Sequence, residues 1–454
     1  MPKQYSNNLD YLKPDTLKNF VDILEKKDGK RLFNRIKDYH PAEIASYIQI
    51  LNEGHRKKLI KTLSKDFDTK ILVELESSFL AKIVDEIDLE IFSKAIIELD
   101  SDEAASIIDV LDSGRRKELF SRIPKKNRES IEENLSYEEN TAGRLMQSEI
   151  VKIQHEHNVG EVIDYLRKEK KLPKVFYDLF VINKNEILLG TVSLSSIIST
   201  ARKIKINTLL KKIPESIHFS VDQEEVADIF RKRNLTSLAV VNDKKKLLGV
   251  VNVEDVVDVI DLEAEEDLLK LAGVGEQSFY GAIISVSKAR FTWLFFNLIA
   301  AFVASYFIKN FEDTIEKFAI LAALMPIIAS MGGCSGTQSL TTAVRAIAMK
   351  QLTWSNALRS TGKEVLVGFF NGCIFSLATF IITFLWFGDF ILSCVISISL
   401  LLNLIFGSFF GTFIPIVLTR FGIDPAIASG TFVTMLTDII GFLMFLTLAA
   451  TYLT

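Results

Sequence analysis

Cysteine is nearly absent from this sequence: three of its 454 residues are cysteine, and all three follow residue 333. The first 287 residues therefore have no disulfide framework, which fits a reducing compartment such as the cytosol. The amino terminus, MPKQYSNNLDYLK, lacks the apolar core of a signal peptide, so we expect no cleaved secretory signal. Neither a GxxxxGK(S/T) phosphate loop nor an HExxH motif is present, so we expect neither an enzyme nor an ATP-driven pump.

Charged residues are scarce in the last third of the chain. From residue 288 onward there are nine Lys or Arg and seven Asp or Glu, whereas the first 287 residues hold 44 basic and 50 acidic side chains. The acidic balance of that first region argues against nucleic acid as a partner. The scarcity of charge in the last third, together with its long apolar runs, predicts a membrane region whose partner is the lipid bilayer.

Five apolar stretches are long enough to cross the hydrocarbon core as α-helices, which needs roughly 20 residues each. They cover approximately residues 291–308, 318–344, 365–387, 390–419 and 425–452. With the N-terminus inside, seven Lys or Arg flank the spans on the cytoplasmic side and two flank them on the other side. By the positive-inside rule we predict a multi-pass protein of the cell (inner or plasma) membrane, with a cytoplasmic N-terminus and the C-terminus outside.

Asp438 is the one acidic residue well inside a span. A carboxylate at mid-bilayer costs at least about 2.5 kcal/mol, so it normally faces a water-filled path or a partner. Thr434 and Gly441 share its helix face at four- and three-residue spacing, which gives a polar, small-residue stripe suited to a hydrated cation. A protonated Asp438 bonded to a neighbouring helix is the alternative. We favour the ion pathway, because an ionisable group inside the membrane is a functional candidate by default.

The second span contains Pro326 and, after it, a cluster of glycines. We expect Gly332 and Gly333 to interrupt the helix and to free carbonyl groups for a cation, with Gln338 beside them. Two further pairs of glycines at four-residue spacing favour plain helix packing: Gly368 with Gly372, and Gly407 with Gly411.

Two internal repeats organise the first region. Residues 38–64 align with residues 98–124 at nine of 27 positions, and each unit reads as helix, glycine turn, helix. This repeat predicts an α-helical solenoid within residues 1–134. Residues 180–199 align with residues 239–258 at six of 20 positions, and each unit reads as strand, turn, strand, helix, with a further helix before it. The second repeat predicts a pseudo-twofold α/β pair, with its units at 140–203 and 204–258.

The most polarised segment follows, because residues 254–267 contain eight acids and no base. Apolar residues at helical spacing predict an amphipathic helix that connects the α/β pair to the membrane region. Like charges this close repel one another by a few tenths of a kcal/mol per pair. A divalent cation, which takes Asp and Glu oxygens, would relieve that repulsion. A solvated acidic face is the alternative, and the position of the segment next to the membrane region favours the metal.

In this order and combination, these features resemble the MgtE family of magnesium channels and transporters. Four stretches carry the resemblance: Thr141–Met146, Leu248–Val251, Glu263–Asp267 with Leu271–Val274, and Asp424–Ala426 leading to Thr437, Asp438 and Gly441. The resemblance implies a multidomain membrane protein with an α-helical N-domain, a tandem CBS pair, a connecting plug helix at 259–287 and a five-helix transmembrane pore domain at 288–454. It also implies a homodimer with the pore between the two membrane domains.

The resemblance also assigns residues. Asp438 corresponds to the family's transmembrane aspartate that holds a hydrated ion. The family's regulatory metal-binding acids correspond to Asp255, Asp258, Glu263, Glu266 and Asp267, to Asp222 and Glu224 opposite Asp424, and, as N-domain candidates, to Asp102 and Asp109. The implied function is Mg²⁺ influx down its electrochemical gradient, shut off when cytosolic Mg²⁺ occupies these acids.

Some positions depart from the family pattern. Cys334 stands where an asparagine is usual, Thr431 stands where a proline is usual after Ser429, and Asn234 stands where an aspartate often occurs. A thiol tilts a site toward softer metals, so transport of Mn²⁺ or Co²⁺ is an alternative, as is a non-conducting, CBS-regulated membrane sensor. Some relatives bind ATP between the CBS units. The run of residues 193–196 here, SLSS, lacks the aspartate that often holds the ribose, so the sequence leaves ATP binding open.

Overall fold

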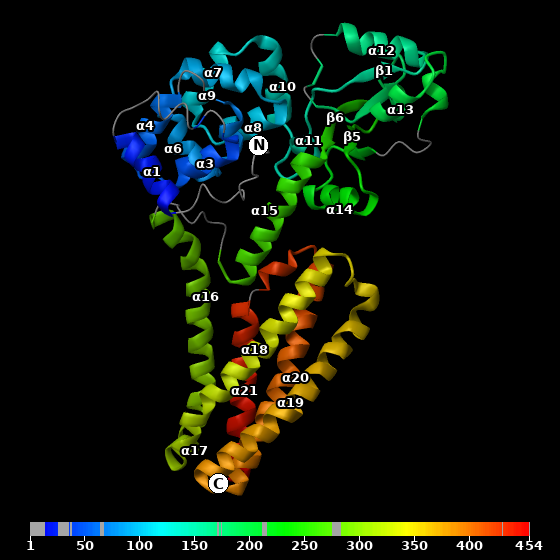
Figure 1. Cartoon of the computed structure of the whole chain (residues 1–454). Helices are drawn as coiled ribbons and strands as arrows, with labels where there is room; N and C mark the ends of the chain where they lie inside the picture. Colours follow the sequence, from blue (N-terminus) through cyan, green and yellow to red (C-terminus); the bar gives the residue numbers. More distant parts are fainter. Residues whose placement is uncertain are drawn as a thin grey trace, which may run out of the picture. The chain divides into compact units, whose positions relative to one another are not determined.

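The computed structural model describes most of the chain, and its described residues belong to two compact units, Met1–Asp261 and Leu262–Thr454 (Figure 1). The described residues are 14–25, 36, 39–63, 68–169, 172–173, 175–210, 216–274, 283–428 and 430–453. Ser429, the residue that precedes the departure from the family pattern at Thr431, lies outside them.

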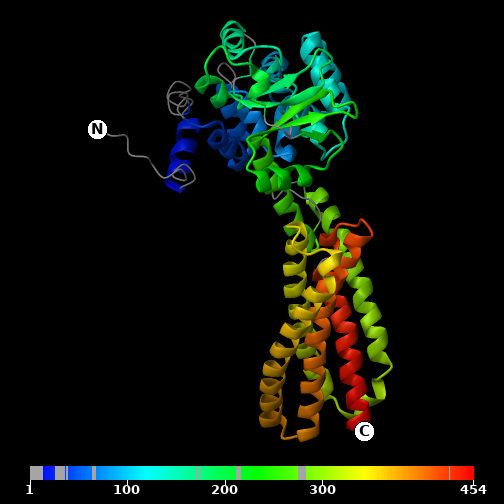
Figure 2. The same ribbon diagram turned by 90° about the vertical axis from the view of Figure 1, so that its right-hand side faces the viewer.

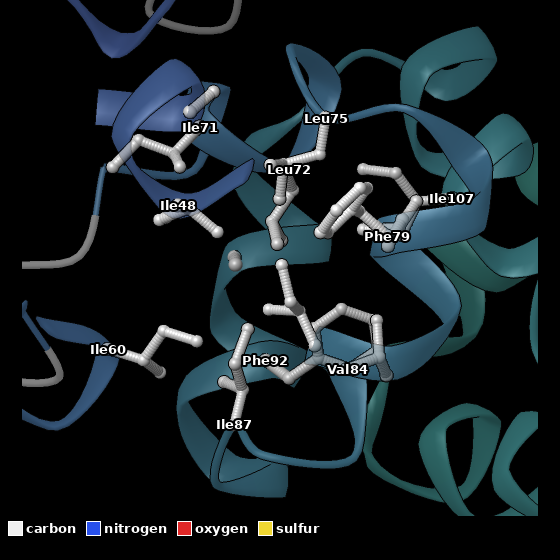
Figure 3. Packing of buried hydrophobic residues seen from close by; sticks show 14 of the residues in the cluster. Ile48, Ile60, Ile71, Leu72, Leu75, Phe79, Val84, Ile87, Phe92 and Ile107 are labelled. Carbon is white, nitrogen blue, oxygen red and sulfur yellow. The ribbon is translucent and has the colours of Figure 1, made fainter. Parts of the chain in front are cut away.

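The first part of the first unit is helical. Its helices are α1 (Pro14–Glu25), α3 (Pro41–Ile50), α4 (Glu53–Leu63), α5 (Lys70–Val73), α6 (Ser77–Val84), α7 (Leu89–Glu98), α8 (Ser101–Asp109), α9 (Ser113–Arg122), α10 (Lys125–Leu135) and α11 (Ala142–Leu145). The predicted repeat corresponds to the helix pairs α3–α4 and α8–α9. Figure 3 shows how their apolar side chains meet those of α5, α6 and α7 in one core, with Leu72 and Phe92 near its centre. The α-helical solenoid prediction is confirmed.

The turn between the helices of each repeat differs from the prediction in its chemistry. Gly54 and Gly114 do not make the turn, because each is the second residue of its helix, α4 or α9. The residue that caps each helix is polar instead: Asp112 accepts hydrogen bonds from the backbone of Gly114, and Asn52 accepts one from His55. A Cβ at position 114 would come within 3.1 Å of the capping Asp112 oxygen, so glycine leaves room for the cap.

Two three-stranded sheets follow, in the orders β1-β2-β3 and β4-β5-β6. Their elements are β1 (Lys152–Gln154), α12 (Val159–Lys168), β2 (Asp178–Ile182), β3 (Leu188–Ser193), α13 (Leu194–Ser199), the 3-10 turn η2 (Ile206–Thr208), β4 (Ser216–His218), α14 (Gln223–Arg233), β5 (Ser237–Val241) and β6 (Leu247–Asn252). In each sheet the first strand is parallel and the third antiparallel to the middle strand. The repeat predicted the middle and third strands. It missed β1 and β4, because three-residue strands carry no periodic signal.

The two sheets are related as the repeat predicts. Each hairpin has its register shift at the matching position, between Val181 and Ile182 in one and between Val240 and Val241 in the other. The two hairpin turns also pair with each other, since the amide of Leu188 bonds to the carbonyl of Lys245 and that of Leu247 to the carbonyl of Glu186. Helix α15 (Val253–Leu271) then runs from the first unit into the second.

The second unit is a bundle of long helices. They are α16 (Ile283–Lys309), α18 (Ile320–Ala348), α19 (Ala357–Phe387), α20 (Phe390–Arg420) and α21 (Gly430–Tyr452), with the short α17 (Glu312–Lys317), η3 (Trp354–Asn356) and η4 (Pro425–Ile427) between them. Among the residues that the structure describes, five helices are long and apolar enough to cross a membrane, as predicted. They run side by side in both views (Figures 1 and 2), with α18 packed against α20 and α21, and α19 against α20. The third span begins earlier than predicted, because the polar residues before 365 already form its first turns.

The expected interruption of the second span is wrong. Helix α18 continues through Pro326 and through the glycine cluster that follows. The glycines are explained by close packing instead, since a Cβ at Gly336 would collide with Val433 of α21. The packing prediction for the other pairs is confirmed: Gly368 faces Ser408, Gly372 faces Leu401, and Gly407 and Gly411 face the backbone of α18.

Candidate functional site

A groove of about 830 Å³ runs along α18 and α21 within the membrane-spanning bundle. It is lined by Ala329, Ser330, Gly333, Cys334, Thr337, Gln338, Thr341, Thr342, Thr434 and Asp438. Most of these side chains carry hydroxyl, amide or carboxyl oxygens at a depth where apolar residues are the rule. Such a lining suits a hard cation that keeps part of its water shell.

Asp438 supplies the negative charge of this groove. Its Oδ1 atom is buried and has no hydrogen-bond partner among the described residues. Within one chain, no described residue of a neighbouring helix therefore donates a hydrogen bond to that oxygen. This argues against the alternative in which a protonated Asp438 is bonded to a neighbouring helix. Thr434 lies one turn before it and faces Gly333 across the helix pair. The structure thus brings Asp438, Thr434, Gly333 and Gln338 together, as the sequence predicts.

Two of the predicted pathway glycines lie elsewhere. A Cβ at Gly332 or at Gly441 would collide with the side chain of Asn403, which sits fully buried on α20. Asn403 donates a hydrogen bond of 2.9 Å to the carbonyl of Ile328. Gly332 and Gly441 therefore make room for a buried amide that ties α20 to α18, and they do not line the groove. Asn403 could not be identified from the sequence, because a single polar residue in an apolar run does not show which helix it faces.

The predicted regulatory acids Asp102 and Asp255 come together inside the first unit. Asp102 lies on α8 and is buried, and its Oδ1 atom has no hydrogen-bond partner among the described residues. Burial, followed by the nearby charge of Asp255, raises the pKa of Asp102 well above its usual range. Burial also raises the pKa of Asp255, to about 7, and Glu103 and Asp258 add to the negative charge around it. These crowded carboxylates need protons or a cation.

The other predicted regulatory acids differ from this pair. Asp109 is already neutralised, since Arg144 and Arg116 lie 2.6 Å and 3.1 Å from its two oxygens, and the structure therefore argues against it as a metal ligand. Asp222 caps α14 by accepting a hydrogen bond from the amide of Glu224. Burial and the neighbouring Asp261 raise the pKa of Asp258.

The end of α15 is seated on the membrane helices of the second unit. Leu271 packs against Leu340, Val344, Ala426, Ala428 and Val433, which belong to α18, to α21 and to the turn before α21. Beside it, the ammonium of Lys270 lies 2.7 Å from a carboxylate oxygen of Asp424 and also bonds Glu266. Burial by itself would lower the pKa of Lys270, but these hydrogen bonds outweigh it and raise that pKa. The sequence analysis missed Lys270, which supplies a positive partner for this part of the acidic helix.

Asp267 and Glu263 lie on the same stretch of α15. Burial, followed by the charge of Asp424, raises the pKa of Asp267 to about 6. Lys270 therefore compensates only part of the negative charge at the end of α15, because Asp267 still experiences a net acidic field.

Among the residues that the structure describes, no three His, Cys, Asp or Glu side chains converge closely enough to enclose a metal ion. Within the described ranges, this geometry excludes a site of the kind that Zn²⁺ occupies, in which protein side chains replace the waters around the ion. It suits Mg²⁺, which keeps several waters and is commonly held by one or two carboxylates. Of the buried carboxylate oxygens that have no hydrogen-bond partner among the described residues, two belong to predicted site residues, Asp438 and Asp102.

The residues between the CBS-like units bear on nucleotide binding. Ser193 bonds the hydroxyls of Ser195 and Ser196, so the first unit offers hydroxyl groups where an aspartate would hold a ribose. In the second unit Asp255 occupies the corresponding position, and it accepts a hydrogen bond from the amide of Asn252. Of these two matching positions, therefore, the one in the second unit carries a carboxylate.

Three family profiles match the chain. The profile described as MgtE, divalent cation transporter, matches residues 325–448, and that of the MgtE intracellular N domain matches residues 39–140. The CBS domain profile matches twice, at residues 142–203 and 208–262.

Curated and solved proteins resemble the chain over most of its length. The magnesium transporter MgtE of Enterococcus faecalis is 32% identical over 323 residues, which are 71% of each chain. That of Thermus thermophilus is 31% identical over 327 residues, or 71% of this chain and 72% of the relative. A crystal structure of the cytosolic domain of the Mg²⁺ channel MgtE in complex with ATP matches with a TM-score of 0.50 and 24% identity, over 54% of this chain and 99% of that one, and shows the fold.

Proposed function

Because the chain belongs to the MgtE family of divalent cation transporters, we propose that it carries Mg²⁺ across a cell membrane through the groove along α18 and α21. The observation that carries the proposal is Asp438, a carboxylate with an unpartnered oxygen in a polar groove of a membrane bundle. Relatives of this chain are named magnesium transporters, and the hydroxyl, amide and carboxyl groups of the lining side chains can bind a hydrated hard cation.

A homodimer completes this pathway in our proposal. The groove of one chain is open along its length and offers one carboxylate. Two copies facing each other would enclose the groove and place two Asp438 side chains around one ion. One or two carboxylates with retained water is the usual environment of Mg²⁺ in proteins.

Transport in our proposal is passive and runs inward. At −100 mV each elementary charge gains about 2.3 kcal/mol on moving inward, so a divalent cation needs no other driving force. The excess of Lys and Arg on one side of the spans supports a cytoplasmic N-terminus and an outer C-terminus. On this account the protein performs no catalysis.

Cytosolic Mg²⁺ closes the pathway by binding the crowded acids. Asp102 with Asp255, and Asp267 with Glu266 and Asp424, are sets of carboxylates whose mutual repulsion a divalent cation relieves. Shifting a gate from 1:99 to 99:1 takes about 5.5 kcal/mol of differential binding, a quantity that several weak sites per subunit can supply. The seating of Leu271 on the cytoplasmic ends of α18 and α21 is the contact that such binding would stabilise.

Nucleotide binding is a separate proposal. The solved relative contains ATP, and the second CBS unit of this chain carries a carboxylate, on Asp255, at the position that matches Ser196 of the first unit. We propose ATP as a weak ligand of the CBS pair. Titration of the full-length protein with ATP is expected to show weaker binding for Asp255→Asn than for the wild type, and unchanged binding in Asp255→Asn would contradict a role of this carboxylate.

The transport proposal is tested by ion flux into liposomes that contain the purified full-length protein. Mg²⁺ flux is expected for the wild type, and flux at the level of protein-free liposomes for Asp438→Asn. Asp389→Asn is the matched control, because Asp389 caps the start of α20 and asparagine keeps that cap.

Two outcomes would favour the alternatives. Flux of Mn²⁺ or Co²⁺ without Mg²⁺ flux would identify a softer physiological ion and turn attention to Cys334, whose thiol lines the groove. Absence of any flux with Mg²⁺ removed from the cytosolic side would favour a non-conducting sensor.

A further inference from the structure

Helix α19 lies at the outer edge of the bundle and presents two opposite faces (Figures 1 and 2). One face carries Gly368 and Gly372, which pack against α20. The opposite face is an exposed apolar ridge that repeats every three or four residues. It consists of Leu366, Phe370, Ile374 and Leu377, each about 60% exposed.

At the cytoplasmic end of this ridge, the same face continues with two cations. Arg359 and Lys363 are exposed, stand one helical turn apart and have no ion-pair partner among the described residues. The adjacent acid, Glu364, points instead toward α18, where its carboxylate accepts a hydrogen bond of 3.2 Å from Ser339. Two like charges at this spacing repel each other. An anion bound at this end of the ridge would relieve that repulsion.

The surroundings of the two cations add to this preference. Trp354 is half exposed, and the guanidinium of Arg420 stacks on its ring at 4.1 Å. An indole at the interface with a stacked guanidinium is typical of a membrane boundary at the depth of lipid head groups.

We propose that the outward face of α19 is a binding site for one anionic phospholipid, whose phosphate head group contacts Arg359 and Lys363 and whose acyl chains lie along the apolar ridge. An acyl chain needs an exposed apolar strip several turns long, and the ridge supplies it directly below the cations. Bulk zwitterionic lipid also covers such a ridge, but it lacks the net negative charge that the two cations favour. Each cation near an anionic lipid surface contributes about 1 kcal/mol.

A second copy of the chain is the competing occupant of this ridge. It is less favoured, because the polar groove along α18 and α21 lies on other helices than α19 and is the surface that two copies would share. Two unpaired cations from each copy would also meet at such an interface.

Native mass spectrometry of the delipidated full-length protein, with phosphatidylglycerol and phosphatidylcholine in competition, tests the site. The wild type is expected to retain one phosphatidylglycerol in preference to phosphatidylcholine. The double variant Arg359→Gln/Lys363→Gln is expected to bind phosphatidylglycerol about 30-fold more weakly, the loss of two attractions of about 1 kcal/mol each. The matched control is Lys309→Gln/Lys317→Gln, which removes two charges at the other end of the bundle and is expected to keep the preference.

Several results would overturn the proposal. One is an unchanged preference in Arg359→Gln/Lys363→Gln, and another is displacement of the lipid by millimolar inorganic phosphate alone, which would identify a phosphate site. The charge-preserving swap Arg359→Lys/Lys363→Arg guards against a folding defect, since a loss of the preference there too would trace the effect to packing. A shift to dimers without bound lipid would assign the ridge to a second copy. None of these readouts depends on ion flux, so they stand apart from the test of transport.

Discussion

The two units of this protein differ in the surroundings of a buried carboxylate. In the unit Met1–Asp261, Asp102 lies near Asp255, whose charge adds to burial in raising the pKa of Asp102. In the unit Leu262–Thr454, the groove carboxylate Asp438 has one oxygen without a hydrogen-bond partner among the described residues, whereas Asp267 and Asp424 lie close together beside Lys270. In our proposal, the crowded acids change their packing when a cation binds, whereas Asp438 binds an ion and releases it.

This difference matches two physical demands. A sensor needs a binding energy large enough to move a gate, and crowded carboxylates store that energy as repulsion. A conducting site needs binding weak enough for the ion to leave, and one carboxylate with a hydrated ion meets that need. We therefore predict that substitution of the crowded acids changes the inhibition of flux by Mg²⁺, and that substitution of Asp438 changes the flux itself.

The largest separable effect is expected from the double variant Asp102→Asn/Asp255→Asn. Without the crowded charges, cytosolic Mg²⁺ has less repulsion to relieve, so inhibition of flux by cytosolic Mg²⁺ is expected to be lost while flux through Asp438 persists. Flux into liposomes at low and high Mg²⁺ on the cytosolic face measures this. Asp243→Asn, at an exposed turn, is the control. If cytosolic Mg²⁺ inhibited flux through the double variant as strongly as through the wild type, the crowding of Asp102 and Asp255 would not explain the inhibition.

The pH dependence of the first unit follows from the same pair. The pKa of Asp255 is raised from 3.8 to about 7, so the folded state holds this proton more tightly than the unfolded state does. The associated stability is fully present below about pH 4 and is lost as the pH rises through 7, a change on the order of a few kcal/mol. Hydrogen exchange of residues 253–261 at pH 6 and pH 8 is expected to show less protection at pH 8, and added Mg²⁺ to restore it. In Asp255→Asn the difference should disappear.

A smaller effect is expected from Lys270→Met. Its ammonium holds the end of α15 to Asp424, and a charged hydrogen bond of this kind contributes about 1.5 kcal/mol, or about tenfold in the seated population. The rate of cross-linking between Leu271→Cys and Ala428→Cys measures how often the end of α15 is seated on the membrane helices. The experiment uses a chain that lacks its native cysteines, in a buffer without Mg²⁺. Lys270→Arg keeps the charge and should cross-link as the parent does. Equal rates for Lys270→Met would show that the ion pair does not hold the helix.

The smallest effect is expected from Asp109→Asn. Because Arg144 and Arg116 already neutralise this carboxylate, inhibition by Mg²⁺ should stay within about twofold of the wild type. A large loss of inhibition, at unchanged thermal stability, would mean that an acid paired with arginine also senses Mg²⁺, and the contrast between crowded and paired acids would then fail.

The sequence predicted those site residues that stand out from their neighbours within a single helix. Asp438 stood out because one acid in a long apolar run is costly wherever the helix packs. The packing of Asn403 against Gly332 and Gly441 could not be predicted, because it depends on the rotation of α18, α20 and α21 about their axes. For the same reason, the glycine cluster after Pro326 indicates a break in the helix when only the sequence is considered, although α18 is continuous.

The five apolar helices, the two repeats and the position of Asp438 were determined by the sequence alone, because composition and periodicity act within one helix or one strand. The tertiary structure alone decided which acids are crowded, paired or isolated. Lys270 and Asp424 are 154 residues apart, and Asp102 meets Asp255 only once the helical domain is folded against the start of α15. A carboxylate's charge state depends on burial and on its nearest charges, and in a folded chain both are set by residues remote in the sequence.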